Sequence, residues 1–341
     1  MCGRPGGPAF LLLGKTHYFY GMKRKTFRRL SLVMISVGVL FACSKKLPNL
    51  SGNTPQFNTS VRVQADDQAR ISGEIDNIFN DVNTVLGEHD TLAAGERDTV
   101  KSALCGAVVT VDAVDTPNNI FIQYRAGYSC DASRYMTGTI GIYFNPGTRW
   151  STANDTTFIS ITNLGITRVK DGQVIFFNGN FDYSNVSGGT LASLQSGNAG
   201  PIVHTITGYN IGIEYNDSLH TAWTITRKRQ YTYSSSNTVI STTGVDTAGG
   251  QSDVSEFGGN RYGNSVIVSV DTPLVISSGC NWQIMSGQVH LTNPIGVSVV
   301  KYGLDSLGNA TGCPVSGVPY YYSISWSGSA ENPLSGIFSY Y

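Results

Sequence analysis

The sequence predicts a mainly β protein: a large antiparallel β-sandwich or open barrel-like sheet, with a short N-terminal helical segment and a disordered lipidated tether. Three observations support this fold class. A cysteine follows a secretory signal, a helical apolar period comes next, and alternating apolar and polar stretches fill the rest. We divide the chain into a leader and signal peptide (1–42), a tether (43–60), a helical segment (61–103) and an antiparallel β domain (104–341).

The signal is of the bacterial lipoprotein type. Met22 opens a basic run, Lys23–Lys25, and we take it as the true start of the chain. An apolar segment follows from Leu30 to Leu40, and about 11 residues are too few for a transmembrane helix, which needs about 20. The segment closes with Leu40-Phe41-Ala42-Cys43, which resembles a lipobox. We therefore expect cleavage before Cys43 and acylation of its sulfur.

Acylation at Cys43 makes the membrane the first expected partner. Two or three acyl chains give stable anchoring, whereas a single chain binds only marginally. Residues 44–60 are rich in Asn, Ser, Thr, Pro and Gly, which is typical of a flexible tether. Ser44 is compatible with sorting to the outer membrane, and Lys45 and Lys46 stand where surface-exported lipoproteins carry acidic residues. We expect lipid anchoring at the periplasmic face of the outer membrane.

The charge balance excludes some partners. The chain has 23 basic and 23 acidic residues, but seven basic and no acidic residues precede Cys43. The mature chain therefore carries a net charge of about −7, which argues against nucleic acid and against electrostatic attachment to anionic lipid.

The helical segment has one apolar face and several acidic residues. The apolar positions recur every three or four residues: Ile71, Ile75, Ile78, Phe79, Val82, Val85 and Leu86. The acidic residues occupy the other sides, and we expect solvent to cover them: Asp66, Asp67, Glu74, Asp76 and Asp81. Gly87 is a plausible stop, and a second helical turn is expected within 93–103.

The β domain shows the two-residue period of half-buried strands. Tyr322, Ile324 and Trp326 share one face of a strand, as do Trp223 and Ile225 of another. We expect strands at 107–111, 120–126, 136–144, 156–161, 173–181, 202–215, 219–234, 264–276, 282–291, 295–302 and 320–327. Two segments rich in Gly and Ser, 184–201 and 242–260, are expected to be mobile hairpin tips.

Four cysteines remain after Cys2 of the leader and Cys43 are set aside. An even number in a compartment that permits disulfides indicates two bridges, and we favour Cys105–Cys130 and Cys280–Cys313 because each pair flanks two adjacent strands. A zinc site built from all four thiolates is the alternative, although the chain lacks a Cys-x-x-Cys pair.

The assembled pieces resemble a family of uncharacterised β-rich lipoproteins common in the Bacteroidetes. The resemblance covers most of the mature chain and is most specific at 271–274, at Ser278-Gly279-Cys280-Asn281-Trp282 and at 286–289. The turn from Tyr302 to Cys313 departs from the family pattern by an extra loop with fewer acidic residues. The motifs shared with this family are structural, and the resemblance implies a location in the cell envelope. It implies no activity, because the family has none assigned.

Chemical motifs are sparse. The five histidines lack metal-ligand spacing, and we find no nucleophile elbow, zinc-protease helix motif or phosphate-binding loop. Asp246, Asp253 and Glu256 lie in one segment and have the oxygen ligands that Ca²⁺ prefers, but their spacing fits no defined calcium loop. We assign no catalytic residue, metal or cofactor from the sequence.

We therefore expect a non-catalytic cell-envelope lipoprotein that acts in binding or scaffolding, with an envelope protein or a glycan as partner. The alternative is a surface glycan-binding module of a polysaccharide-uptake system, since 18 Tyr and 4 Trp could supply rings that stack on sugars. Three or more exposed aromatic residues in a line would favour that alternative. A hydrolase is the third hypothesis and requires two converging carboxylates.

Overall fold

The structure is a computed structural model of the chain. It describes residues 54–90, 104, 106–112, 119–126, 134–145, 147–216, 220–280, 282–313, 320–328 and 334–339. Cys43, Cys105, Cys130 and the helical turn expected within 93–103 lie outside these residues.

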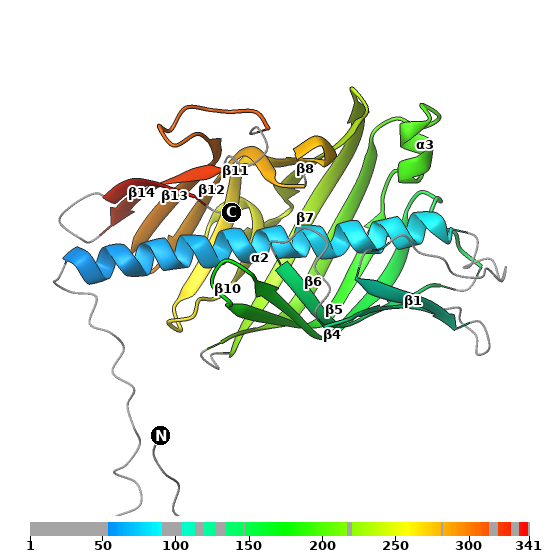
Figure 1. Cartoon of the computed structure of the whole chain (residues 1–341), viewed down its shortest axis with the longest axis horizontal. Helices are drawn as coiled ribbons and strands as arrows, with labels where there is room; N and C mark the ends of the chain where they lie inside the picture. The colour runs from blue at the N-terminus through cyan, green and yellow to red at the C-terminus, as the bar shows by residue number, and fades with distance from the viewer. Residues whose placement is uncertain are drawn as a thin grey trace, which may run out of the picture. The chain divides into compact units, whose positions relative to one another are not determined.

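All strands within the described residues belong to one antiparallel sheet, which confirms the β class and its barrel-like form (Figure 1). The strands are β1 (Ala107–Asp112), β2 (Asn119–Tyr124), β3 (Arg134–Tyr143), β4 (Asp155–Arg168), β5 (Val174–Asn185), β6 (Ile202–Tyr215), β7 (His220–Ser234), β8 (Asn237–Gly244), β9 (Asp246–Ala248), β10 (Gln251–Gly259), β11 (Ser265–Ser277), β12 (Ile284–Asn293), β13 (Gly296–Leu304), β14 (Tyr321–Gly328) and β15 (Leu334–Ser339). Two short helices, α3 (Leu191–Gln195) and the 3₁₀ helix η2 (Ser278–Cys280), lie in connections.

The pairing closes into a ring in the middle of the sheet. Strand β7 pairs with both β8 and β10, and these two strands both pair with β11. Strand β8 pairs with the second half of β7, from Arg227 onward, and β10 pairs with residues 223–225 of the first half. Residues 242–260 therefore contain a central strand, and the expectation of a mobile hairpin tip there was wrong. The other segment expected to be a tip, 184–201, contains the capped helix α3.

Bulges on four neighbouring strands bend the first half of the sheet. Register shifts occur at Gly138 of β3, Asn163 of β4, Gly179 of β5 and Asn210 of β6, and all four residues have positive φ. A bulge adds one residue to a strand, bends it and increases the local twist. The two asparagines begin similar tetrapeptides, Asn-Leu-Gly-Ile and Asn-Ile-Gly-Ile, so the sequence marks the bend twice.

Aromatic rings cover glycines on adjacent strands. Gly165 lies opposite Phe176, Gly208 opposite Phe181, and Gly258 opposite Trp223. At each of these glycines an added Cβ would meet the ring at less than 3.0 Å. The cross-strand ring fills the space that the glycine leaves and restores packing at that position.

Helix α2 (Thr54–Glu88) is the first element and is longer than expected, since it begins within the segment expected to be tether. Between Gln64 and His89 only Glu88 is exposed, so other parts of the protein surround the helix. Its apolar face enters the core as the period predicts, through Ile71, Ile75 and Phe79 among others. Its acidic residues are also turned toward the sheet, so the expectation that solvent covers them was wrong. None of the helices that the structure describes is long and apolar enough to cross a membrane.

The disulfide Cys280–Cys313 is confirmed. It joins η2 to the connection after β13, with a sequence separation of 33 and a Cα–Cα distance of 5.1 Å. Because two of the four cysteines are bonded to each other, a zinc site of four thiolates is excluded.

Candidate functional site

A buried cluster of charged groups lies between α2 and strands β7 and β10. Arg227 of β7 donates from Nη2 to Glu256 Oε2 of β10 at 2.7 Å and from Nη1 to Asp76 Oδ1 of α2 at 3.2 Å. It also donates to the backbone oxygen and to Oγ of Ser72, both at 3.0 Å. Ser72 in turn donates from Oγ to Glu256 Oε1 at 2.7 Å. Gln68 donates to the same carboxylate oxygen.

A second arginine extends this cluster along the helix. Arg229 lies two residues further along β7, with its Nε 3.7 Å from Asp76 Oδ1 and its Nη2 2.5 Å from Asn80 Oδ1. Its guanidinium also stacks on Tyr231, 5.2 Å from the ring centroid. The buried cluster thus holds two arginines and two carboxylates, so its formal charges cancel.

A row of polar residues on one face of α2 lies against these arginines, because the residues recur at the spacing of the helical turn. Gln68, Ser72, Asp76 and Asn80 are spaced four residues apart, and side chains at that spacing lie on one face. Along β7 every second residue from Trp223 to Tyr231 is buried, Trp223, Ile225, Arg227, Arg229 and Tyr231, and of the residues between them only Thr226 is also buried. The two-residue period predicted for Trp223 and Ile225 therefore also places the arginines inside.

Burial and pairing act in opposite directions on Arg227. Removal from water lowers the pKa of its guanidinium, but Glu256 and Asp76 raise it, and the net direction is upward. The side chains of Arg227 and Glu256 are 1% and 0% exposed. Each charge in the cluster depends on its partners, since an unpaired charge in such a site costs several kcal/mol.

A cluster of aromatic residues with one histidine adjoins Arg229. Tyr183 Oη lies 2.6 Å from His204 Nδ1 and 3.3 Å from Tyr231 Oη. Trp150 packs on His204 and donates from Nε1 to Asn83 of α2 at 3.2 Å. Burial lowers the pKa of His204 well below its usual value, and the neighbouring Arg229 lowers it further. The imidazole is therefore neutral in the physiological range.

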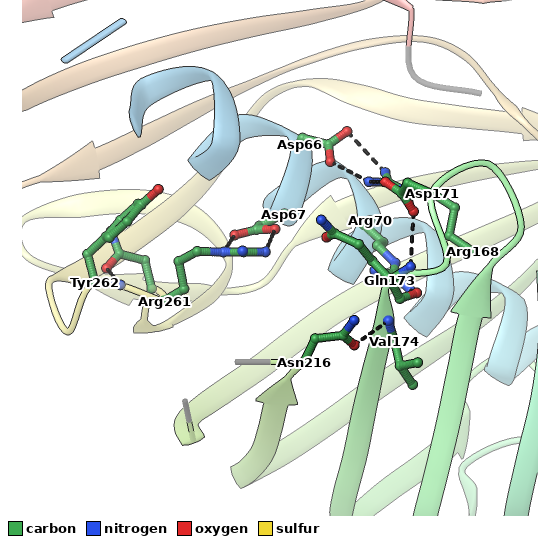
Figure 2. Close-up of polar contacts among 11 residues, drawn as sticks. Asp66, Asp67, Arg70, Arg168, Asp171, Gln173, Val174, Asn216, Arg261 and Tyr262 are labelled. Atoms are coloured by element: carbon green, nitrogen blue, oxygen red, sulfur yellow. Dashed lines mark hydrogen bonds and ion pairs between the residues drawn. The ribbon is translucent and has the colours of Figure 1, made fainter. Parts of the chain in front are cut away.

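Further polar contacts hold residues 66–70 of α2 (Figure 2). Arg168 of β4 contacts Asp66 through Nη1 and Nη2, at 3.2 and 3.0 Å, and also binds Asp171 in the turn after its own strand. Arg261 binds Asp67 with two nitrogens, at 2.6 and 2.5 Å. Arg70 donates to the backbone oxygen of Gln173 at 2.9 Å.

The pairing continues along the helix. Arg134 binds Glu74 at 2.9 Å, and Tyr124 donates its hydroxyl proton to Asp81 Oδ2 at 2.6 Å. Every carboxylate of α2 between residues 66 and 81 therefore has an arginine or tyrosine partner that comes from another element.

The buried cluster is poorly arranged for catalysis. Asp76 and Glu256 are the two carboxylates brought together, and both bind the same guanidinium. Acid–base hydrolysis needs one protonated and one ionised carboxyl group on either side of a substrate bond. The two side chains are 3% and 0% exposed, so a saccharide cannot contact them.

The side-chain direction of Glu256 also contradicts a calcium site formed by Asp246, Asp253 and Glu256. Glu256 points into the interior toward Arg227. Asp246 accepts a hydrogen bond from the backbone of Thr247, and Asp253 accepts one from Ser252. The three carboxylates do not meet. No group of three His, Cys, Asp or Glu residues able to hold a metal ion occurs in the part of the chain that the structure describes.

Three aromatic rings form a line on the face of the sheet turned away from α2. Phe121 of β2, Tyr143 of β3 and Phe158 of β4 have centroid separations of 6.1 and 6.0 Å. Phe158 is 43% exposed. Their neighbours in sequence, such as Ile120, Ile142 and Ile159, are buried on the opposite face. Phe121 and Tyr143 are half-buried, so the line falls short of the three exposed aromatic residues expected for the glycan-binding alternative, although its rings lie side by side on this face.

Sequence reasoning missed the arginine–carboxylate cluster. The signal was present: two arginines fall on the apolar phase of β7, and four polar residues recur at every fourth position of α2. What the sequence lacks is any indication that the helix and β7, about 150 residues apart, face each other.

Comparisons with family models, with curated proteins and with solved structures gave no match.

Proposed function

We propose that this protein is a non-catalytic lipoprotein of the cell envelope, anchored in the outer membrane by acyl chains on Cys43 and acting in binding or scaffolding. The family of β-rich Bacteroidetes lipoproteins that the sequence resembles supports this proposal. The periplasmic face of the membrane remains our assignment for the folded domain, on the basis of Lys45 and Lys46.

The observation that carries the proposal is the position of α2. The helix begins at Thr54, so ten residues separate it from Cys43. Ten extended residues span at most about 36 Å, which keeps the folded domain close to the membrane surface. Ion pairs and the apolar core hold the same helix within the sheet, so the tether leads directly into an element that is fixed in the interior.

The state of the charged groups supports a role without catalysis. The interior arginines and carboxylates bind one another, and the buried histidine is neutral and enclosed by aromatic rings. Groups that are paired in this way stabilise the helix inside the sheet.

Metabolic labelling tests the anchor. Cells that express the full chain are grown with radiolabelled palmitate, and the protein is purified and compared with a Cys43→Ala variant. We expect label in the natural chain and none in the variant, together with a mature amino terminus at residue 43. An unlabelled natural chain, or equal labelling of both, overturns the anchoring proposal.

Glycan binding is the second candidate function, within a polysaccharide-uptake system. The line of Phe121, Tyr143 and Phe158 favours it, because adjacent rings at a sheet surface, here one exposed and two half-buried, offer stacking faces for sugar rings.

A further inference from the structure

We infer that the face of strands β2–β6 turned away from α2 carries a binding site for a neutral polysaccharide. This inference deepens the proposed binding role by naming a site and a ligand class. It depends on the register of five strands, on four aromatic rings, of which two are exposed and two half-buried, and on the polar residues between them.

The strand register places these residues in two parallel rows. In the first row Asn119, Tyr143, Phe158, Asp182 and Thr207 are successive partners across β2 to β6. Residues directly opposite each other in antiparallel strands point to the same side of the sheet. The row therefore forms one continuous strip about 19 Å long, from four strand spacings of about 4.8 Å.

The second row runs beside the first. Phe121, Gly141, Ser160 and Asn180 are partners across β2 to β5. On β6 the bulge after Gly208 turns Tyr209 outward, next to this row, where it is 68% exposed. Aromatic rings thus stand at both ends of the strip.

The ring of Tyr143 lies against the sheet. A Cβ added at Gly141 would come within 2.8 Å of the Tyr143 ring, so the ring covers this glycine. Phe121 and Phe158 are inclined to Tyr143 by 90° and 57°. Tyr143 therefore forms a floor, and the two phenylalanines stand on either side of it.

The polar residues between the rings supply hydrogen-bonding groups. Asn180 and Asp182 are exposed, and their side chains make no hydrogen bond to any residue that the structure describes. Amide and carboxylate groups beside aromatic rings match a sugar, which presents apolar C–H faces and a rim of hydroxyl groups.

The charge of the strip selects among ligands. Its two rows contain one carboxylate, Asp182, and no lysine or arginine. Nucleic acids, anionic lipids and acidic polysaccharides all need basic groups. A neutral polysaccharide is the ligand that fits a strip of aromatic, hydroxyl and amide side chains.

Affinity electrophoresis tests the site. The full mature protein, in a non-ionic detergent, is run in native gels that contain galactomannan, xyloglucan or glycogen, with polygalacturonate as the acidic comparison. We expect at least one neutral polymer to retard the protein and polygalacturonate to leave its mobility unchanged.

Three variants locate the binding. Tyr209→Ala and Phe158→Ala remove exposed rings of the strip, and we expect each to weaken retardation roughly 2- to 10-fold, the range for one aromatic contact of about 0.5–1.5 kcal/mol. Tyr233→Ala removes a ring of similar exposure, 39%, on β7 outside the strip, and it should bind like the natural chain. Thermal unfolding of each variant confirms that the fold is kept.

Retardation by none of the neutral polymers, or equal retardation of the natural chain and both strip variants, overturns the site. The result is independent of acylation. If the chain binds the polymer but carries no palmitate, the binding site stands and the anchoring proposal fails. If the chain carries palmitate but binds no polymer, only the anchoring proposal stands.

Discussion

Arg227 on strand β7 and Glu256 on strand β10 form an ion pair of 2.7 Å in which neither side chain is more than 1% exposed. The pair joins two strands of the ring, and both residues also bind α2, through Asp76 and Ser72. The same contacts therefore close the sheet and hold the helix.

Removal of Arg227 should be the most destabilising single change in this cluster. Arg227→Met leaves the carboxylates of Glu256 and Asp76 buried without their main partner, and we expect a loss of about 3–5 kcal/mol in the free energy of unfolding. Urea denaturation followed by tryptophan fluorescence measures the loss. The control is Lys228→Met, an exposed neighbour on the same strand, which should change stability by less than about 0.5 kcal/mol.

A double variant separates pairing from packing. Arg227→Met combined with Glu256→Leu removes both partners, so it should cost less than Arg227→Met alone. If the double variant is the less stable of the two, the cluster does not owe its stability to mutual charge compensation.

Asp67 should make stability depend on pH below neutrality. Burial raises the pKa of its carboxyl group from 3.8 to about 6, although Arg261 opposes the shift. The folded state thus binds this proton more tightly than the unfolded state. The resulting stabilisation is fully present below pH 3.8 and is lost as the pH rises through about 6. Between pH 4.5 and 6 we expect the stability of the natural chain, relative to Asp67→Asn, to fall by at most about 1.4 kcal/mol per pH unit.

A second carboxylate provides the control for this pH dependence. Burial raises the pKa of Asp171. Hydrogen bonds from Arg168 and from the backbone of Gln173 lower this pKa by more than burial raises it, so the net shift is downward. Asp171→Asn should therefore leave the pH slope between 4.5 and 6 unchanged. The measurement is the urea midpoint of the natural chain, Asp67→Asn and Asp171→Asn between pH 4.5 and 6. An equal dependence of the midpoint on pH in the natural chain and Asp67→Asn would contradict the prediction.

Gly303 is required for close packing as well as for its backbone angle. Its φ is +77°, and an added Cβ would lie 1.8 Å from the backbone oxygen of Met285. Gly250 has nearly the same φ, +78°, with no atom within 4 Å of an added Cβ. Gly250→Ala should cost about 1–2 kcal/mol from backbone strain, and Gly303→Ala a further 1–3 kcal/mol from the clash. Equal losses in thermal or urea unfolding would show that strain alone matters.

The Cys280–Cys313 disulfide should contribute measurably to stability. A closed loop of 33 residues corresponds to about 3–4 kcal/mol on the chain-entropy model. Cys280→Ala/Cys313→Ala should therefore unfold at a lower urea concentration, and a reducing agent should lower the midpoint of the natural chain but not that of the variant. A reductant effect of the same size in both proteins would assign the stabilisation to other cysteines.

The local pattern of the chain was sufficient for most of the secondary structure. The two-residue period located strands such as β6, β7 and β14, because alternation of apolar and polar residues reports directly which side of a strand is buried. The pairing Cys280–Cys313 also followed from neighbouring strands. Strand β10 was missed because its glycines and serines resemble a loop, and cross-strand rings such as Trp223 supply the packing that its own side chains lack.

For the candidate binding strip, the sequence predicted only that the chain is rich in aromatic residues. The aromatic content is visible in the sequence, but Phe121, Tyr143 and Phe158 come from three strands, and the register alone brings them into line.

The sequence by itself determined the periods, the turns and the polar stripe of the helix, since these depend on residues a few positions apart. Only the tertiary structure decided that the acidic side of α2 is buried. The reason is physical: a carboxylate belongs in water unless a cation meets it. For Asp67 and Asp76 those cations are arginines supplied by residues about 150 to 190 positions away, where the sheet folds around the helix.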